Sequence, residues 1–232
     1  MKKYLIQLIG ENIDIEDLSD GLRASKWKII KDSESYYLTS EILNSKSETN
    51  EIMSTAKEFI DIINGSAKVI HRNHKRVTTG SLTTIDENGN KSVDVFISAS
   101  IESRSRLRAT LTLVNDENIE NRPTTIENWI DKAFLHKPIR DALYFFNELT
   151  WWNLYKIYEI IKFDVGGGNK IYKYQEKNKI KHFTQTSQSR EAIGDSARHA
   201  TEIYKAPKKP LTLNEAHTII RILFENWINN AN

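Results

Sequence analysis

The sequence predicts an α+β protein, in which an N-terminal α/β module of antiparallel hairpins and one helix precedes a C-terminal helical bundle. Three observations lead to this class. In the first half of the chain most apolar residues alternate with polar ones, the period of strands that bury one face. In the second half they recur three and four residues apart, the period of helices. A polar segment, 115–125, lies between the two patterns and is the expected linker, so domains are predicted at 1–122 and 123–232.

Strands account for most of the predicted N-terminal domain. The first is expected at 3–9, and a hairpin with a polar turn follows within 27–42. Residues 77–85 are rich in threonine, and the Asn-Gly pair at 88–89 favours a type I′ hairpin turn after them. The tract 92–114 then alternates again and predicts a long, bent or broken strand.

One helix interrupts these strands. Between Ser47 and Asn64 the apolar residues form a single stripe at helical spacing: Ile52, Ala56, Phe59, Ile60 and Ile63. Ser47 or Thr49 is expected to cap its first turn, and Asn64 with Gly65 is expected to stop it in a left-handed conformation.

The C-terminal domain is predicted as a series of helices with identifiable ends. Thr125 and Thr150 are expected to cap two of them, and Pro138 to open another. The three glycines at 166–168 follow a helix, so we interpret them as a helix stop; phosphate-binding loops require strand–loop–helix order. Further helices are predicted at 190–204 and 213–229.

Composition excludes several classes of protein. The chain has no cysteine, which excludes disulfides, thiol chemistry and cysteine-ligated metals. No apolar run approaches the roughly 18 residues that span a bilayer, so no membrane partner is expected. The apolar stretch at the N-terminus is interrupted by Gln7 and is interpreted as a strand rather than a signal peptide. A cytoplasmic protein without a cofactor is the expectation.

The C-terminal half is mildly basic, with 16 Lys and Arg against 12 Asp and Glu in residues 126–232. Its lysines are interleaved with rings: Lys170, Lys173, Lys177, Lys179 and Lys181 alternate with Tyr172, Tyr174, His182 and Phe183. Rings that stack on bases beside ammonium groups that pair with phosphates suit single-stranded RNA or DNA. A solvated lysine-rich loop is the alternative.

A second basic feature is predicted on the long strand. Arg104, Arg106 and Arg108 alternate with apolar residues and would present a row of guanidinium groups about 7 Å apart, which matches nucleic-acid phosphates. The alternative is that these arginines pair with acids on neighbouring strands, such as Asp94 and Glu102.

Candidate catalytic residues lie in the predicted helix 190–204. On one helix Asp195 would share a face with Arg198 and His199, which follow it by three and four residues. A carboxylate beside an imidazole raises the basicity that a general base needs, and Arg190 or Arg198 would stabilise a developing anion. The alternative is a structural network that docks this helix onto Glu148, Glu159 or the polar run 184–189.

Metal ligation is not expected. Glu191, Asp195, His199 and Glu202 are the nearest set of suitable side chains, but Arg198 lies among them and would repel a cation. His71 and His74 lack a third ligand nearby.

Several segments resemble the C-terminal part of uncharacterised bacterial proteins: 154–159, 195–200, 207–216 and Trp227. More distantly, a helix with Leu-Tyr and Glu followed by one with Arg and His is similar to HEPN helical domains. That resemblance implies an RNA-binding or RNA-cutting module of toxin and anti-phage systems, with an arginine and a histidine as its active residues. Such domains space the two by four to six residues, whereas Arg190 precedes His199 by nine and Arg198 adjoins it.

Two functions follow from these observations. The first is a bacterial binding module, of the kind found in phage-defence or mobile-element systems, that engages nucleic acid or a protein partner. The alternative is a metal-independent ribonuclease in which His199 is the base and Arg190 or Arg198 stabilises the anion. Adjacent Trp151 and Trp152 cannot both be buried on one helix face, so one of them is expected to face the N-terminal domain or another subunit, which suggests a homodimer.

Overall fold

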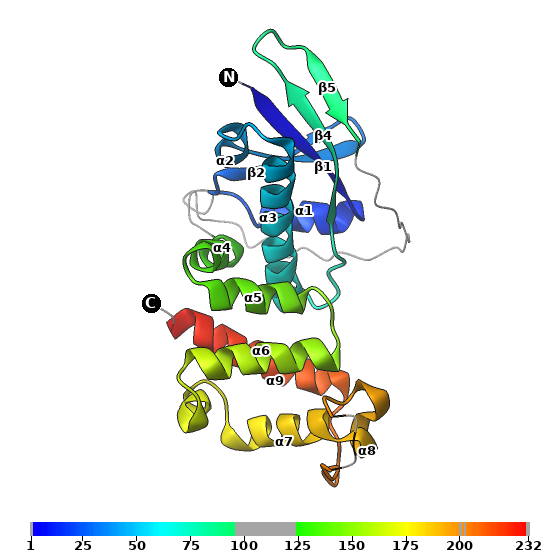
Figure 1. Cartoon of the computed structure of the whole chain (residues 1–232), viewed down its shortest axis with the longest axis vertical. Coiled ribbons are helices and arrows are strands. Elements are labelled where there is room, and N and C mark those ends of the chain that lie inside the picture. The colour runs from blue at the N-terminus through cyan, green and yellow to red at the C-terminus, as the bar shows by residue number, and fades with distance from the viewer. Residues whose placement is uncertain (1, 96–123, 200, 202, 231–232) are drawn as a thin grey trace, which may run out of the picture. The chain divides into compact units, whose positions relative to one another are not determined.

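The computed structural model describes residues 2–95, 124–199, 201 and 203–230, and it has the predicted α+β architecture (Figure 1). The chain divides into two compact units, Met1–Asp131 and Lys132–Asn232, each of which has its own core. The antiparallel sheet lies in the first unit, and the second unit is helical. Across the described residues no helix combines the length and apolar character needed to cross a membrane.

The first unit is built on a five-stranded antiparallel sheet in the order β2-β3-β1-β4-β5. Its strands are β1 (Lys3–Ile9), β2 (Trp27–Asp32), β3 (Ser35–Ser40), β4 (Thr78–Ile85) and β5 (Lys91–Asp94). β1 is central, and its buried Ile6 lies opposite Leu38 of β3 and Leu82 of β4. β4 shows the alternation of burial expected of a strand, whereas Tyr4, Leu5 and Ile6 of β1 are all buried.

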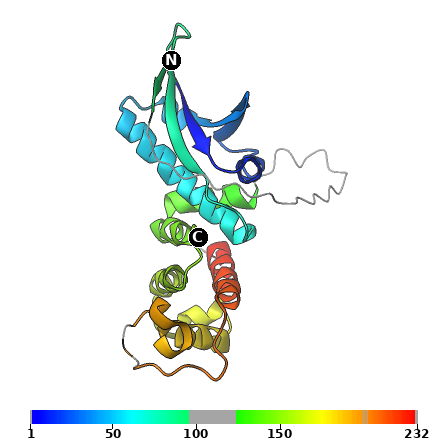
Figure 2. The ribbon, with the colours of Figure 1, turned by 90° about the vertical axis from the view of Figure 1, so that its right-hand side faces the viewer.

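Helix α3 (Thr49–Ile70) lies along one side of the sheet (Figure 2), where Phe59 stacks on Trp27 of β2 with ring centroids 3.9 Å apart. The short helices α1 (Asn12–Asp20) and α2 (Glu41–Asn44) complete this unit together with the start of α4 (Thr125–Leu135). α1 was not predicted, because its only buried apolar residues are Ile15 and Leu18.

The predicted end of α3 is wrong. The helix continues through Asn64 and Gly65 for six residues after Asn64, because the Asn64 side chain is hydrogen-bonded to Val77 instead of capping its own helix. Its start is also not capped as predicted, since the residue at the N-cap is Glu48 and its side chain accepts no hydrogen bond from the first turn. In the β4–β5 hairpin Gly89 has a φ of +84° while Asn88 does not have a positive φ, so the turn is not type I′.

The second unit is arranged around α6 (Trp151–Asp164), which contacts α5 (Lys137–Phe146), α7 (Lys177–Gln188) and α9 (Leu213–Asn230). Between α6 and α7 lies the 3₁₀ helix η2 (Gly168–Lys173), and after α7 come α8 (Arg190–Ile193) and the 3₁₀ turn η3 (Gly194–Ser196). Phe183 of α7 packs against the rings of Trp151, Tyr155 and Tyr158.

Most predicted helix ends in this unit are confirmed. Thr150 caps α6 by accepting a hydrogen bond from the Asn153 N–H, and Pro138 lies in the first turn of α5. The glycines at 166–168 all have positive φ angles and follow the end of α6. The predicted helix 190–204 is wrong: α8 ends at Ile193, since Gly194 has a φ of +62°, and only a 3₁₀ turn follows.

The two units divide between Asp131 and Lys132, whereas the sequence predicts a boundary at 122/123. The first turn of α4 is held by its own unit. Glu127 accepts hydrogen bonds from the N–H groups of Ala24, at 2.6 Å, and Thr124, at 2.7 Å. Thr124 in turn accepts from the Glu127 N–H, so Thr124, rather than the predicted Thr125, caps the helix.

Candidate functional site

The four predicted catalytic residues do not share a helix face. Arg190 lies on the single-turn helix α8, Asp195 lies in η3, and Arg198 and His199 follow η3 in irregular backbone. The relation that suggested a carboxylate–imidazole pair, a separation of four residues on one helix, is therefore absent. Each of these side chains has instead its own surroundings.

Arg190 and Asp195 form an ion pair at the surface, with Nη2 and Oδ1 2.7 Å apart. The Asp195 side chain is 90% exposed, so water screens this pair strongly. The ring of His199 lies against the ring of Tyr204 with centroids 4.7 Å apart. No hydrogen bond or ion pair of His199 is found among the described residues, so no carboxylate there orients its imidazole.

Arg198 forms a well-defined cluster with α6 and α7, which we name the Arg198 clasp and define as Arg198, Tyr155, Glu159 and Gln188. The guanidinium donates to Tyr155 Oη at 2.8 Å and pairs with Glu159 Oε1 at 2.8 Å. Its Cζ also lies 4.5 Å from the centre of the Tyr155 ring, and Gln188 Nε2 donates to the same phenol at 2.7 Å. The clasp thus attaches the chain after α8 to two helices of the core.

Further hydrogen bonds hold the chain that returns from the clasp to α9. The Arg198 N–H donates to the carbonyl of Ser187, and the Ala206 N–H donates to Glu191. A ring nitrogen of His182 lies 2.7 Å from the carbonyl of Lys209. These contacts match the structural alternative, a docking network that includes Glu159 and the polar run 184–189. Tyr155, which sequence reasoning placed only in the core, is its central acceptor.

A second group of side chains comes together at one end of the same unit, where predicted residues within 170–177 join Lys162 and Tyr158, which were not predicted as part of it. Lysine ammonium groups lie over tyrosine rings: Lys162 over Tyr158 at 5.7 Å, Lys173 over Tyr174 at 5.6 Å and Lys177 over Tyr172 at 5.6 Å. Lys170 lies beside them, close to Gly166, where a Cβ atom would come within 2.9 Å of its Nζ. We name these four lysines and three tyrosines the lysine–tyrosine surface.

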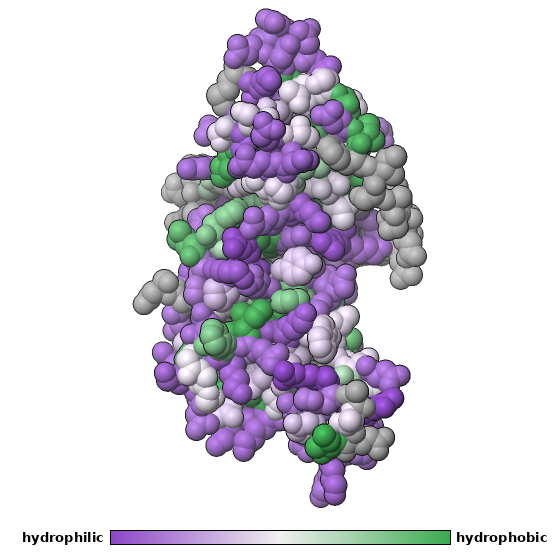
Figure 3. Space-filling view, in the orientation of Figure 1, coloured by the Kyte–Doolittle hydropathy of each residue, from purple (hydrophilic) through white to green (hydrophobic). Residues whose placement is uncertain are grey.

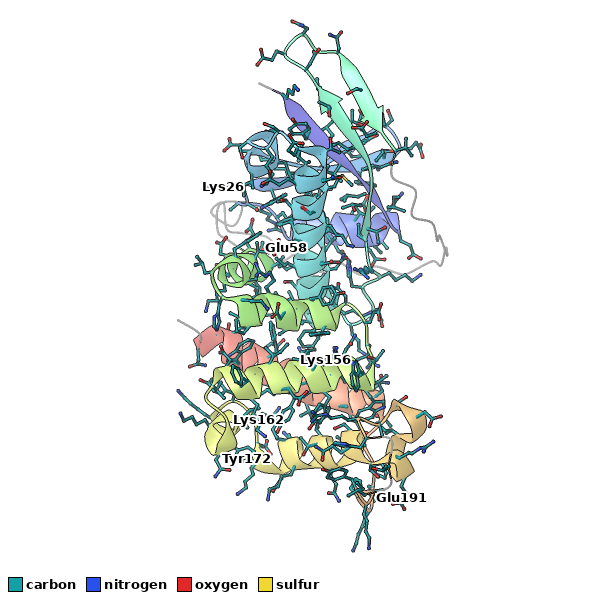
Figure 4. The ribbon with its side chains drawn as sticks, in the orientation of Figure 1. Lys26, Glu58, Lys156, Lys162, Tyr172 and Glu191 are labelled. Carbon is teal, nitrogen blue, oxygen red and sulfur yellow. The ribbon has the colours of Figure 1, made fainter. Side chains whose placement is uncertain are left out.

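The lysine–tyrosine surface is formed by three helical elements, not by the loop that was considered as an alternative. Lys162 is in the last turn of α6, Lys170 to Lys173 are in η2, and Lys177 begins α7. Lys162 and Tyr172 can be located in Figure 4, where the end of α6 and η2 come together. Only part of the predicted interleaving of lysines and rings forms this surface, because Phe183 is buried in the core and Lys179 pairs with Glu176.

The charges of this surface are largely uncompensated. Among the described residues, Lys162, Lys170, Lys173 and Lys177 form no ion pair, whereas Lys179 pairs with Glu176. Burial raises the pKa of Tyr158, although the nearby ammonium of Lys162 acts to lower it. Tyr158 itself is buried, so the half-exposed rings of Tyr172 and Tyr174, beside four ammonium groups, are the ones that can meet an anion with flat, stackable groups.

The other predicted features lie outside the described residues or belong to a structural network. Arg104, Arg106 and Arg108 lie outside the described residues. His74 is buried beside Asp14 and Asn64, at 3.3 Å and 2.9 Å, in a network that holds the chain between α3 and β4. Within the described ranges no three His, Asp or Glu side chains are placed to hold a metal ion.

Comparison with known proteins identifies no relative, since no family model, no curated protein and no solved structure matches this chain.

Proposed function

We propose that this protein binds single-stranded nucleic acid through the lysine–tyrosine surface of its second unit. The observation that carries the proposal is that three ammonium groups lie over tyrosine rings while their lysines form no ion pair among the described residues. Ammonium groups that no carboxylate neutralises remain available to pair with phosphates.

The chemistry of the surface fits a single strand better than a duplex. In a duplex the flat faces of the bases are stacked and only phosphates and base edges are accessible, so tyrosine rings would have no function. A single strand exposes both base faces and phosphates. On binding, a base would take the face of Tyr172 or Tyr174, and the lysine above that ring would move to the neighbouring phosphate.

Fluorescence anisotropy with labelled single-stranded RNA and DNA of mixed sequence tests the proposal. We expect affinity at low salt to exceed that for a duplex of the same length. Replacing three lysines together, in K170Q/K173Q/K177Q, should weaken binding and reduce the slope of log K against log salt by about 2 units, because each phosphate contact to a single strand contributes about 0.7.

The matched control removes the same charge elsewhere in the unit, in K205Q/K208Q/K209Q, whose lysines are exposed. This control should bind almost as the wild type does. Tyr172→Leu should lower affinity about tenfold and leave the salt slope unchanged, because stacking does not release counterions. Equal losses in the two triple variants would show a net-charge effect and overturn the proposal, as would absence of binding at low salt.

The ribonuclease hypothesis receives no support from the geometry of its residues, since Arg198 is held in the clasp and Arg190 pairs with Asp195. It remains testable in the same samples. Incubation of labelled RNA with the wild type and with His199→Ala in EDTA separates the hypotheses, because a ribonuclease that uses His199 as its base would cleave only in the wild type. If neither protein cleaves RNA, binding remains the proposed function.

A further inference from the structure

We infer that the outward face of α6 is a contact surface for a second copy of this chain, in which two α6 helices pair antiparallel about a two-fold axis. Four residues form this face, which we name the α6 seam: Trp152, Lys156, Glu159 and Phe163. The inference is independent of nucleic-acid binding, because none of these residues belongs to the lysine–tyrosine surface.

The spacing of the α6 seam is that of a helix pair. Its residues follow one another at intervals of four, three and four, which places them within about 60° of each other around the helix. This is the spacing of the contact positions in antiparallel coiled coils and helical bundles. The opposite side of α6 is already buried by α5, α7 and α9. The seam is therefore a second face of the same helix with the residue spacing of a packing surface.

The two ends of the seam are apolar and accessible. Phe163 is 87% exposed and Trp152 is 52% exposed. Figure 3 shows apolar residues, in green, over α5 and α6 on the face toward the viewer. Burial of each of these two rings in an interface would gain roughly 2 kcal/mol.

The order of residues along the seam favours a second copy over an unrelated partner. Trp152 and Phe163 lie equally far from a point between Ile157 and Tyr158, and so do Lys156 and Glu159. An antiparallel two-fold pairing about that point therefore places Trp152 against Phe163 of the other copy, and Lys156 against its Glu159. Each contact occurs twice, which is the self-complementarity that a two-fold interface requires.

The charged middle of the seam is prepared for this pairing. Lys156 Nζ lies 5.3 Å from the Trp152 ring centre and 4.6 Å from that of Phe145, so its ammonium stays at the apolar face. Figure 4 shows Lys156 on the α5 side of α6. Glu159 binds Arg198 through Oε1, and its side chain remains 44% exposed. Its Oε2 makes no hydrogen bond or ion pair with the described residues and can accept a second cation.

Sedimentation velocity over micromolar to near-millimolar protein tests the inference. We expect the wild type to show a reversible dimer and Phe163→Ser to shift dissociation at least tenfold toward monomer. Leu135→Ser is the matched control, because Leu135 is 89% exposed on α4 and lies outside the seam; this variant should dimerise as the wild type does. A wild type that stays monomeric over the whole range overturns the inference.

Charge exchange tests the central pairs. Lys156→Glu should weaken the dimer by placing like charges together, and K156E/E159K should restore much of it because the pair is re-formed in reverse. Circular dichroism controls for folding, since Glu159→Lys also removes the Arg198 ion pair. If the double variant is folded but dimerises no more strongly than Lys156→Glu, the proposed pairing is contradicted.

Disulfide trapping tests the register, and the cysteine-free chain provides a clean background. Trp152→Cys mixed with Phe163→Cys should form a disulfide-linked heterodimer under mild oxidation, while neither variant alone should cross-link. In the antiparallel register two copies of residue 152 lie about 16 Å apart along the helix axis, too far for a disulfide. Efficient cross-linking of each variant with itself would indicate parallel helices and overturn the register.

Discussion

At the residue scale, Asn64 connects a helix to a strand. Its Nδ2 donates to the Val77 carbonyl at 2.7 Å, and its Oδ1 accepts from the Val77 N–H at 2.9 Å. The ring nitrogen Nε2 of His74 lies 2.9 Å from the same Oδ1, and all three residues are buried. The amide side chain thus satisfies backbone groups that no neighbouring strand reaches.

Replacing this amide by an apolar group of similar size leaves those buried groups without partners. We expect Asn64→Leu to lower the free energy of unfolding by about 3 kcal/mol, measured by urea denaturation. Asn50→Leu is the control, because Asn50 is exposed on the same helix and makes no recorded side-chain bond; its effect should stay within about 0.5 kcal/mol. Equal effects would show that the Asn64 network does not stabilise the fold.

Ser33 carries a local strain in the two-residue turn between β2 and β3. Its φ of +56° makes it the only non-glycine residue with a positive φ in the described part of the chain. Such a conformation costs an L-residue about 1 kcal/mol and glycine nothing. Ser33→Gly should therefore raise the melting temperature by a few degrees, whereas Glu34→Gly, at a position with negative φ, should lower it. Two shifts of the same sign would contradict this account.

At the element scale, a capping box fixes the start of α9. Glu215 accepts hydrogen bonds from the N–H and the hydroxyl of Thr212, both at 2.8 Å, and the Glu215 N–H donates back to Thr212 Oγ1. These bonds lower the pKa of Glu215 from its ordinary value of 4.5. Because the folded pKa is depressed, the stability that the carboxylate contributes is present above the unfolded value and is lost as pH falls through the folded pKa.

Thr212→Ala tests this cap. Without the hydroxyl, the pKa of Glu215 should move up toward its ordinary value, because one of the two recorded bonds to the carboxylate is removed. A carboxyl NMR titration measures the shift. Thr218→Ala is the control, since its hydroxyl donates to the Asn214 carbonyl and does not contact Glu215. An unchanged pKa in Thr212→Ala would show that the backbone bond alone causes the depression.

The helix ends that were predicted correctly are those whose signal is local. The Thr150 cap, Pro138 and the glycine stop depend on a few consecutive residues. The helix α7 was missed because half of its buried positions are Thr186 and Ser187, which no hydrophobic period reveals. The Arg198 clasp could not be predicted as a geometry, since Arg198 and its acceptor Tyr155 are 43 residues apart and no local pattern specifies their contact.

At the scale of the whole molecule, the net charge of +2 hides an asymmetry. Residues 132–232 carry 16 Lys and Arg against 10 Asp and Glu, whereas residues 1–131 carry 17 against 21. The formal charges of the two units are therefore +6 and −4. An anionic partner is attracted by the second unit and repelled by the first. The unit that it meets first therefore depends on how charge is distributed between the units and not on the net charge of the chain. The salt dependence of binding should accordingly report on the second unit.

The continuation of α3 beyond Asn64 has a consequence for the time course of folding. An Asn-Gly pair disfavours helix propagation, so we expect the last turns of α3 to form only when Asn64 binds Val77, 13 residues later. The early turns of α3 do not depend on this contact between distant residues. We therefore expect the end of the helix to form late in folding. Contacts made after the transition state slow unfolding and leave the refolding rate unchanged. Loss of the Asn64 amide will therefore shorten the lifetime of the native state more than it delays its formation.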